Sequence, residues 1–266
     1  MTPSERHTRN VRAWDPAPQD RPIVDSGVAV VTGASRGLGA AIALRLAADG
    51  HAVAVNYLRG REAADAVVER IRRAGGVAVA FGADVVDEGG VASLFAQVAT
   101  TLGPVTVVVA NATGPQPEAS VDDLSWRSHL DQLEFFVKSP TLLVQAALPS
   151  MRASGDGRVI LIGSDAADRA VPGTSAYVAA KNAQIGLTKV WAKELGPDGI
   201  TVNLVQPGWI PVERHAGIDT SSYVADVPLR RMGTPDDVAG MVAYLASNAG
   251  SFITGQRITV NGGHTI

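Results

Sequence analysis

A tyrosine and a lysine stand four residues apart in the stretch Ser175-Ala-Tyr-Val-Ala-Ala-Lys181. Four residues make about one helical turn, so both side chains are expected on one face of a helix. Free tyrosine has a pKa near 10, and proton transfer at neutral pH needs its anion stabilised, at about 1.4 kcal/mol per pKa unit. A cation about 4 Å away at an effective dielectric constant of about 20 supplies on the order of 4 kcal/mol. Tyr177 and Lys181 are therefore a candidate acid/base and its activating cation.

Ser164 is a third candidate, because it ends the apolar stretch Leu161-Ile-Gly-Ser164. The carboxyl ends of parallel strands line the ligand crevice of such sheets, so this hydroxyl could donate a hydrogen bond to the same substrate oxygen as the tyrosine. Taken by itself, the Tyr-x-x-x-Lys spacing also fits a surface pair whose lysine reaches out to water.

A glycine-rich turn, Thr32-Gly-Ala-Ser-Arg-Gly-Leu-Gly39, lies between a predicted strand and a helix predicted over Ala40 to Asp49. Backbone N–H groups in such a turn, together with the helix N-terminus, can approach a pyrophosphate closely. The spacing is G-x-x-x-G-x-G rather than G-x-G-x-x-G, so an ordinary glycine-rich turn is the alternative. Its position in a strand–helix–strand unit favours a nucleotide.

The end of the second predicted strand indicates which nucleotide. It reads Asn56-Tyr-Leu-Arg-Gly-Arg61, with no carboxylate before Glu62 to accept hydrogen bonds from the adenosine ribose. Arg36 and Arg59 can bring positive charge to this corner and bind a 2′-phosphate in bidentate geometry. The corner therefore favours NADP(H) over NAD(H), and the alternative is two solvated surface arginines.

These residues need a scaffold, and the chain alternates short β-rich apolar runs with longer segments of helical period. That alternation predicts an α/β protein, with a doubly wound parallel sheet of about seven strands and helices on both faces, in a single domain. Strands are predicted at Val28–Thr32, Ala52–Asn56, Val77–Gly82, Val105–Ala110, Arg158–Gly163, Ile200–Val205 and Arg257–Val260. Helices are predicted to start near Leu38, Arg61, Glu88, Trp126, Ser175 and Pro235.

Composition excludes several classes of function. The chain has 266 residues, 46% of them hydrophobic, a net charge of −3 and no cysteine. There is no run of basic residues to follow a nucleic acid backbone, and the histidines are scattered without ligand spacing, so neither nucleic acid nor a metal is expected. Residues 1–26 contain four prolines and no apolar stretch for a signal peptide or membrane span. We expect a flexible N-terminal extension on a cytoplasmic protein that does not enter a membrane.

Several motifs follow one another from about Val28 to the C-terminus. They are TGASRGLG, Ala83-Asp-Val85, Asn111-Ala112, Ser164 with Tyr177-Val-Ala-Ala-Lys181, Gln206-Pro-Gly208, Pro228-Leu-Arg-Arg-Met-Gly-Thr-Pro235 and Asn261-Gly-Gly263. In this order and spacing the chain resembles the short-chain dehydrogenase/reductases, and among them the 3-oxoacyl-thioester reductase-like members. The resemblance implies a Rossmann-fold domain over residues 27–266 that contains both the cofactor and the substrate site.

The resemblance also implies roles for individual residues. Tyr177 is the implied acid/base, Lys181 its activator and ribose anchor, and Ser164 the carbonyl polariser. Together with the arginine-rich corner, the expected cofactor-binding set is Gly33, Ser35, Arg36, Gly37, Leu38, Gly39, Asn56, Tyr57, Arg59, Asp84, Val85, Asn111, Tyr177, Lys181, Pro207, Gly208 and Ile210. The implied reaction moves hydride between NADP(H) and a carbonyl or secondary alcohol, such as a ketone or a 3-oxoacyl compound. A homotetramer, or else a homodimer, is the implied assembly.

The chain departs from the family pattern in three places. The family's Asn-Asn-Ala-Gly reads Ala110-Asn-Ala-Thr113, and the threonine expected four positions after Pro207-Gly208 is Val212. The family's catalytic asparagine falls on Phe136 when counted back from Ser164, or near Leu133 when counted forward from Trp126.

Pro140 suggests how the missing asparagine is replaced. In the family the backbone carbonyl of that asparagine holds a water linked to the lysine. Proline has no N–H to give to the carbonyl four residues earlier, which here belongs to Phe136. We therefore expect Phe136 to belong to the catalytic set through its main-chain oxygen. The alternatives are a kink that serves packing only, or a polar side chain such as Gln132 or Glu134 in that place.

Two further expectations concern substrate and activity. Residues Trp209 to Pro228 stand where the family has its mobile substrate loop, and they contain Glu213, Arg214 and His215. We expect this loop to order around a partly apolar substrate with a polar group, the alternative being an interface segment. The alternative to an enzyme is a catalytically silent NADP(H)-binding sensor or scaffold, which the missing asparagine would favour.

Overall fold

All seven strands run parallel, in the order β3-β2-β1-β4-β5-β6-β7, in the computed structural model, which describes residues 27–212 and 217–266. The strands are β1 (Val28–Val31), β2 (Ala52–Tyr57), β3 (Ala78–Gly82), β4 (Val105–Ala110), β5 (Gly157–Ile162), β6 (Ile200–Pro207) and β7 (Arg257–Val260). From β1 the chain first adds β2 and β3 on one side of the sheet and then β4 to β7 on the other. The crevice expected to receive a ligand therefore lies at the carboxyl ends of β1 and β4, where this switch occurs.

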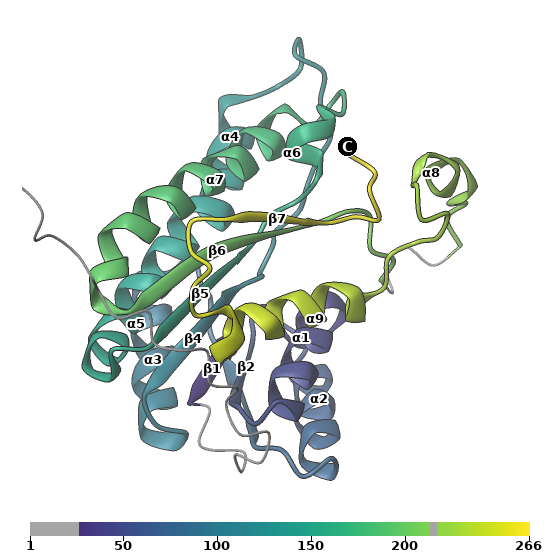
Figure 1. Cartoon of the computed structure of the whole chain (residues 1–266). Helices are drawn as coiled ribbons and strands as arrows, with labels where there is room; N and C mark the ends of the chain where they lie inside the picture. Colours follow the sequence, from purple (N-terminus) through teal and green to yellow (C-terminus); the bar gives the residue numbers. More distant parts are fainter. Residues whose placement is uncertain (1–26, 213–216) are drawn as a thin grey trace, which may run out of the picture.

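The central strands are apolar because both of their faces are covered. Strands β1, β5 and β6 are buried along their whole length. One face packs on α1 (Gly37–Ala48), α2 (Arg61–Arg73) and α9 (Pro235–Ala246). The other packs on α3 (Glu88–Thr101), α5 (Ser139–Ser154) and α7 (Ser175–Leu195). Figure 1 shows these two groups of helices on opposite sides of the sheet. The doubly wound, single-domain α/β fold predicted from the sequence is therefore confirmed.

Helix starts agree with the local signals. Asp87 accepts a hydrogen bond from the Gly90 N–H at 2.6 Å and begins α3. At α9, Thr234 and Asp237 form a reciprocal capping box ahead of Pro235. The helix predicted over Ala40 to Asp49 begins three residues earlier, at Gly37, so the end of the glycine turn is already helical.

The helix predicted to start near Trp126 does start there, but a π-helical turn interrupts its α-helical hydrogen bonding. The structure has α4 (Trp126–Leu133), a π-helical turn η1 (Glu134–Lys138) and then α5. The Ser139 N–H donates to the Glu134 carbonyl, five residues back. Pro140 cannot donate in an α-helix and its ring crowds the carbonyl four residues earlier, so the chain takes an extra residue in the turn.

Several short elements were not predicted, because one turn is too short for a periodic signal. They are α6 (Ala166–Arg169), α8 (Ser221–Asp226) and the 3₁₀ turns η2 (Gly196–Asp198) and η4 (Asn248–Gly250). The predicted N-terminal extension, residues 1–26, and Glu213, Arg214 and His215 of the predicted substrate loop lie outside the described residues.

Candidate active site

The Tyr177–Lys181 pair lies on the first turns of α7, facing the end of β5. Lys181 is buried, and its Nζ donates a hydrogen bond to the Ile162 carbonyl, the last residue of β5, at 2.7 Å. The same Nζ is 5.7 Å from the centre of the Tyr177 ring. Tyr177 itself is half-buried. The structure therefore places both side chains on one face of α7, as the spacing predicted, with the lysine turned into the protein.

Burial has an electrostatic consequence for this pair. It lowers the pKa of Lys181 from 10.5 to about 7, because a charged amine loses its hydration inside the protein. At the distance to the Tyr177 ring, a full charge stabilises a phenolate by on the order of 3 kcal/mol at an effective dielectric constant of about 20. That stabilisation is available only while Lys181 is protonated, so the groups that face its ammonium control the acid/base.

Ser164 follows β5 and lies two residues after the carbonyl that holds Lys181. Its Oγ accepts a hydrogen bond from the Ala166 N–H at 3.2 Å, and the buried Gln206 donates to its carbonyl at 2.8 Å. These bonds fix the strand end while the hydroxyl proton stays available for donation. The serine is thus held at the carboxyl edge of the sheet, on the same side as the α7 pair.

Sequence analysis missed Asp165, which is 1% exposed and anchors the strand end beside Ser164. Its carboxylate accepts from the Arg169 Nε at 3.1 Å and from the Asn261 amide at 3.2 Å. Its N–H donates to the carbonyl of Pro207 at 2.9 Å. The SD pair in the sequence gave no signal, since its partners are up to 96 residues away.

The side chain of Phe136 makes contacts that the sequence did not predict. Its ring, 2% exposed, has its centre 3.8 Å from the Lys181 Nζ and makes an edge contact with the Tyr177 ring at 5.5 Å. Gln132, the suggested polar substitute, donates instead to the Pro115 carbonyl at 2.8 Å. The side chain of Phe136 thus lies at the lysine, while a relay through its main-chain oxygen stays a prediction.

The glycine turn forms the junction between β1 and α1. Gly33 and Gly37 adopt positive φ angles of 61° and 54°. Gly39 has no room for a Cβ, which would lie 2.6 Å from the Asn111 amide nitrogen and even closer to the Gly33 carbonyl. No side chain caps the N-terminus of α1, since Arg36 at the N-cap has an extended backbone and makes no capping bond. The first N–H groups of α1 are therefore free to receive an anion.

Asn111 and Asn56 hold this turn against its neighbours. The Asn111 amide donates to the Thr32 carbonyl at 2.8 Å, and Thr32 Oγ1 accepts the N–H groups of Asn111 and Ala112, both at 2.9 Å. Asn56, 2% exposed, accepts from the Gly33 N–H at 3.4 Å and donates to two carbonyls near the end of β3. Both ends of the Asn56 amide are used inside the protein, so this residue shapes the turn rather than offering a free group.

The other predicted cofactor residues border the same edge. The Tyr57 ring packs on Gly82, the Asp84 Oδ1 accepts from the Val86 N–H at 3.1 Å, and Val85 is buried in the core. Leu38 and Ile210 pack in the opposite core cluster. Pro207 ends β6, and the Gly208 N–H donates to the Val260 carbonyl at 3.1 Å. All of these residues follow or end strands at the carboxyl edge, apart from Leu38 in α1.

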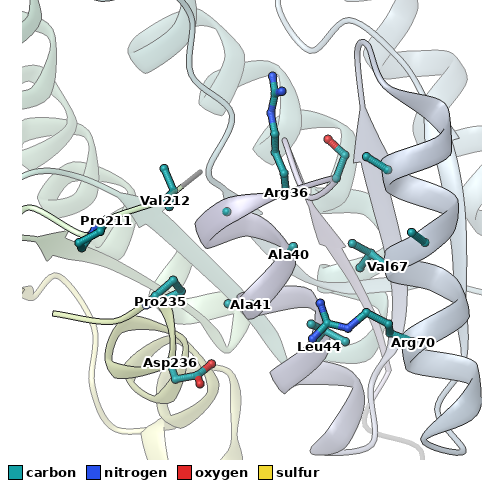
Figure 2. Close-up of a pocket in the computed structure, with 14 residues that line it drawn as sticks. Arg36, Ala40, Ala41, Leu44, Val67, Arg70, Pro211, Val212, Pro235 and Asp236 are labelled. Atoms are coloured by element: carbon teal, nitrogen blue, oxygen red, sulfur yellow. The ribbon is translucent and has the colours of Figure 1, made fainter. Parts of the chain in front are cut away.

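A hollow of about 760 Å³ runs from the glycine turn between α1, α2 and the start of α9. Ser35, Arg36 and Gly37 line it, and Figure 2 shows Arg36 extending from the N-terminus of α1. Ser164 and Tyr177 do not line it, so this hollow borders the anion end of the site and not the acid/base. Arg59 is exposed just after β2. Arg36 and Arg59 are thus both accessible, and their contact with a 2′-phosphate stays a prediction.

An aromatic cluster begins the predicted substrate loop. The Trp209 and Tyr223 rings are 5.4 Å apart, and Tyr223 contacts the His264 ring at 4.5 Å. The Trp209 N–H donates to the Tyr223 hydroxyl at 2.9 Å. Burial is the main cause that raises the pKa of Tyr223 above 10. Through Tyr223 the cluster therefore ties α8 to Trp209, after β6, and to His264, near the C-terminus.

Two searches of the described residues bear on other kinds of site. Within residues 27–212 and 217–266, no cluster of three or more His, Asp or Glu side chains could hold a metal ion. No helix in the same ranges is long and apolar enough to cross a membrane.

Fold and site together define a class of protein. The sheet is doubly wound, and the helix after its glycine turn has no side-chain cap. A buried lysine lies one helical turn from a tyrosine near the ends of the neighbouring strands. This arrangement is that of a nucleotide-dependent oxidoreductase.

Comparison with known proteins agrees with this class. The family model described as "Enoyl-(Acyl carrier protein) reductase" matches residues 33–265. The chain is 39% identical over 240 residues to the 3-oxoacyl-[acyl-carrier-protein] reductase FabG of Staphylococcus aureus strain Mu50, covering 88% of this chain and 96% of that protein. A 3-oxoacyl-[acyl-carrier-protein] reductase of Synechocystis is also 39% identical, over 241 residues, covering 89% and 96%.

Solved structures give the same result. A short-chain dehydrogenase/reductase from Serratia marcescens superposes with a TM-score of 0.85 at 35% identity, covering 92% of this chain and all of that one. A blue fluorescent protein from a metagenomic library, solved with NADPH, has a TM-score of 0.85 at 38% identity and the same coverage. The chain belongs to the short-chain dehydrogenase/reductase family of oxidoreductases.

Proposed function

We propose that the protein is an NADP(H)-dependent reductase of carbonyl compounds, transferring hydride between nicotinamide and a ketone or 3-oxoacyl-type substrate, or the corresponding secondary alcohol. The observation that carries the proposal is the Lys181 ammonium, bonded to the end of β5 next to Ser164 and one helical turn from Tyr177. A buried lysine beside a tyrosine is costly to maintain for packing alone, because burial lowers its pKa to about 7.

The residues of the glycine turn fit the cofactor. The space beside Gly39 excludes a side chain, and the N-terminus of α1 offers unbonded N–H groups to a pyrophosphate. Arg36 and Arg59 are exposed near this end, and no carboxylate follows β2 before Glu62, which favours a 2′-phosphate. The structural neighbour solved with NADPH supports the same choice. When bound, the cofactor supplies or accepts the hydride.

Three side chains handle the proton. In reduction, Tyr177 donates its proton to the substrate oxygen as that oxygen gains negative charge, and Ser164 donates a hydrogen bond to the same oxygen. Lys181 stabilises the phenolate left on Tyr177, by on the order of 3 kcal/mol at the observed distance and an effective dielectric constant of about 20. In oxidation the same phenolate takes the proton from the alcohol.

The test is substrate-dependent oxidation of NADPH over a panel of ketones, quinones and 3-oxoacyl thioesters. We expect turnover of at least one class, and loss of turnover with retained NADPH binding in Tyr177→Phe, which keeps the ring and removes the hydroxyl. Thr100→Ala on α3, an exposed hydroxyl, is the matched control. NADPH binding without turnover of any compound in the wild-type protein would instead identify the silent sensor or scaffold, which the phenylalanine at position 136 favours.

The assembly and the cellular location belong to the same proposal. A homotetramer, or else a homodimer, acting in the cytoplasm is what the family resemblance implies, and we keep it as part of the proposal. Light scattering of the purified chain tests the assembly, with a monomeric mass as the contrary result.

A further inference from the structure

The Lys181 ammonium lies over the face of the Phe136 ring. The centre of the ring lies 3.8 Å from the Lys181 Nζ, with Phe136 2% exposed and Lys181 4% exposed. The edge contact with Tyr177, at 5.5 Å and an interplanar angle of 81°, fixes the ring against the other member of the pair. The negative face of an aromatic ring attracts a cation, most strongly where water is excluded.

The ammonium has no anionic partner among the described residues. Its described hydrogen bond goes to a neutral carbonyl, that of Ile162, and no carboxylate in residues 27–212 or 217–266 lies within 4.0 Å of it. The carboxylates on the elements packed against α7 are paired with arginines, and Lys138 is exposed. The pairs are Asp131 and Glu134 with Arg127, Asp165 with Arg169, Asp168 with Arg257, and Asp198 with Arg152. The ring therefore supplies electrostatic stabilisation that no anion provides.

The π-helical turn decides that this ring, and not a neighbour, reaches the lysine. Phe135, one residue earlier, packs its ring directly on Gly114, and Gln132 bonds to the Pro115 carbonyl. Phe136 lies inside η1, which inserts one extra residue into the helix and ends at Lys138, so the side chains of this turn are rotated relative to a continuous α-helix. Phe136 therefore faces α7.

We propose that the aromatic ring of Phe136 is the positioning residue that keeps Lys181 charged and aligned with Tyr177, by a cation–π contact in place of a polar side chain. This rests on the proposed function only for its effect on turnover. The state of the lysine can be measured without any substrate.

The direct test is titration of Lys181 in the cofactor-free protein by ¹⁵N NMR of the side-chain amines. The chain has four lysines, Lys138, Lys181, Lys189 and Lys193, so the buried one can be assigned by substitution. Phenylalanines with one, two and three ring fluorines, introduced at position 136, weaken the negative ring face in steps while nearly preserving shape. We expect the pKa of Lys181 to fall in parallel, by between about 0.4 and 1.5 in total for a desolvated contact. Phe136→Leu, which removes the ring, should lower the pKa of Lys181 by about as much as three ring fluorines do.

The matched control places the same fluorinated residues at Phe95, a buried ring of α3, whose main packing partners are α5, β3 and β4. These variants should leave the Lys181 titration unchanged. A Lys181 pKa that ignores fluorination at position 136 overturns the proposal. So does a fall in Phe136→Leu alone, since that result would reflect packing and not the ring face.

Turnover gives a second measurement that a purely structural role would not produce. In alcohol oxidation the turnover rate should rise with pH as Tyr177 ionises. Loss of charge on Lys181 should move the pH at which the turnover rate rises to higher values across the fluorine series. Absence of turnover in the wild-type protein would count against the proposed function and leave the NMR titration to decide the role of Phe136. A pH profile that stays fixed while the Lys181 pKa falls would refute the coupling to Tyr177.

Discussion

Replacing Lys181 with methionine should stabilise the folded protein at mildly acidic pH, although it removes the activating cation. Lys181 is 4% exposed, and burial lowers its pKa from 10.5 to about 7. That difference corresponds to about 5 kcal/mol, at 1.36 kcal/mol per pKa unit. Methionine leaves the Ile162 carbonyl without its donor, which costs about 1–3 kcal/mol. The expected net gain in the free energy of unfolding is about 2–4 kcal/mol below pH 7.

The gain should depend on pH in a defined direction. Below pH 7 the lysine is charged in both the folded and the unfolded chain, so the burial cost is present in full. Between pH 7 and 10.5 the folded chain loses the proton while the unfolded chain keeps it, so the cost is relieved as the pH rises. The advantage of Lys181→Met should therefore shrink, and then reverse as only the lost hydrogen bond remains.

Denaturant unfolding followed by circular dichroism measures this difference at about pH 6 and about pH 9.5, at fixed protein concentration. Lys189→Met, at an exposed position of the same helix, is the control and should leave the pH dependence of stability unchanged. The reasoning is refuted if Lys181→Met is less stable than the wild-type protein at about pH 6, or if its effect is the same at both pH values.

Three further results are expected. NADPH should bind at least tenfold more tightly than NADH, about 1.4 kcal/mol. Arg36→Ala should reduce this difference in affinity, whereas the control Arg73→Ala, at an exposed residue paired with Glu69, should leave it unchanged. Calorimetric titration measures the affinities, and equal affinities of the wild-type protein for NADPH and NADH would contradict the prediction. Hydrogen exchange over Trp209 to Pro228 should slow when cofactor and a turned-over substrate bind, because the predicted substrate loop orders over the site. Unchanged exchange would contradict this ordering. Pro140→Ala restores an N–H that can bond to the Phe136 carbonyl, so turnover should fall and its solvent isotope effect rise if that oxygen holds the relay water. Unchanged kinetics in a correctly folded variant would show that the proline serves packing only.

The sequence determined the scaffold because the scaffold is encoded locally. Strands β4 and β7 have the predicted bounds, and α2, α3, α4, α7 and α9 begin at the predicted residues. Apolar runs, capping residues and glycines at positive φ act within a few residues, so the pattern of a covered parallel sheet can be read directly. The carboxyl edge of such a sheet then brings Ser164 and the Tyr177–Lys181 pair to one side of the fold.

Only the tertiary structure decided the contacts between residues that are distant in the sequence. Pro140 accounts locally for the π-helical turn, but the packing of α4 and η1 against α7 decides which side chain meets the lysine. The sequence pointed to the main-chain oxygen of Phe136, whereas the ring is what lies at Lys181, 45 positions further along the chain. Asn56 and Asp165 likewise find partners only after folding. Local patterns fix the elements, but the partner of a buried charge is chosen by packing across the whole core, which no short stretch of sequence contains.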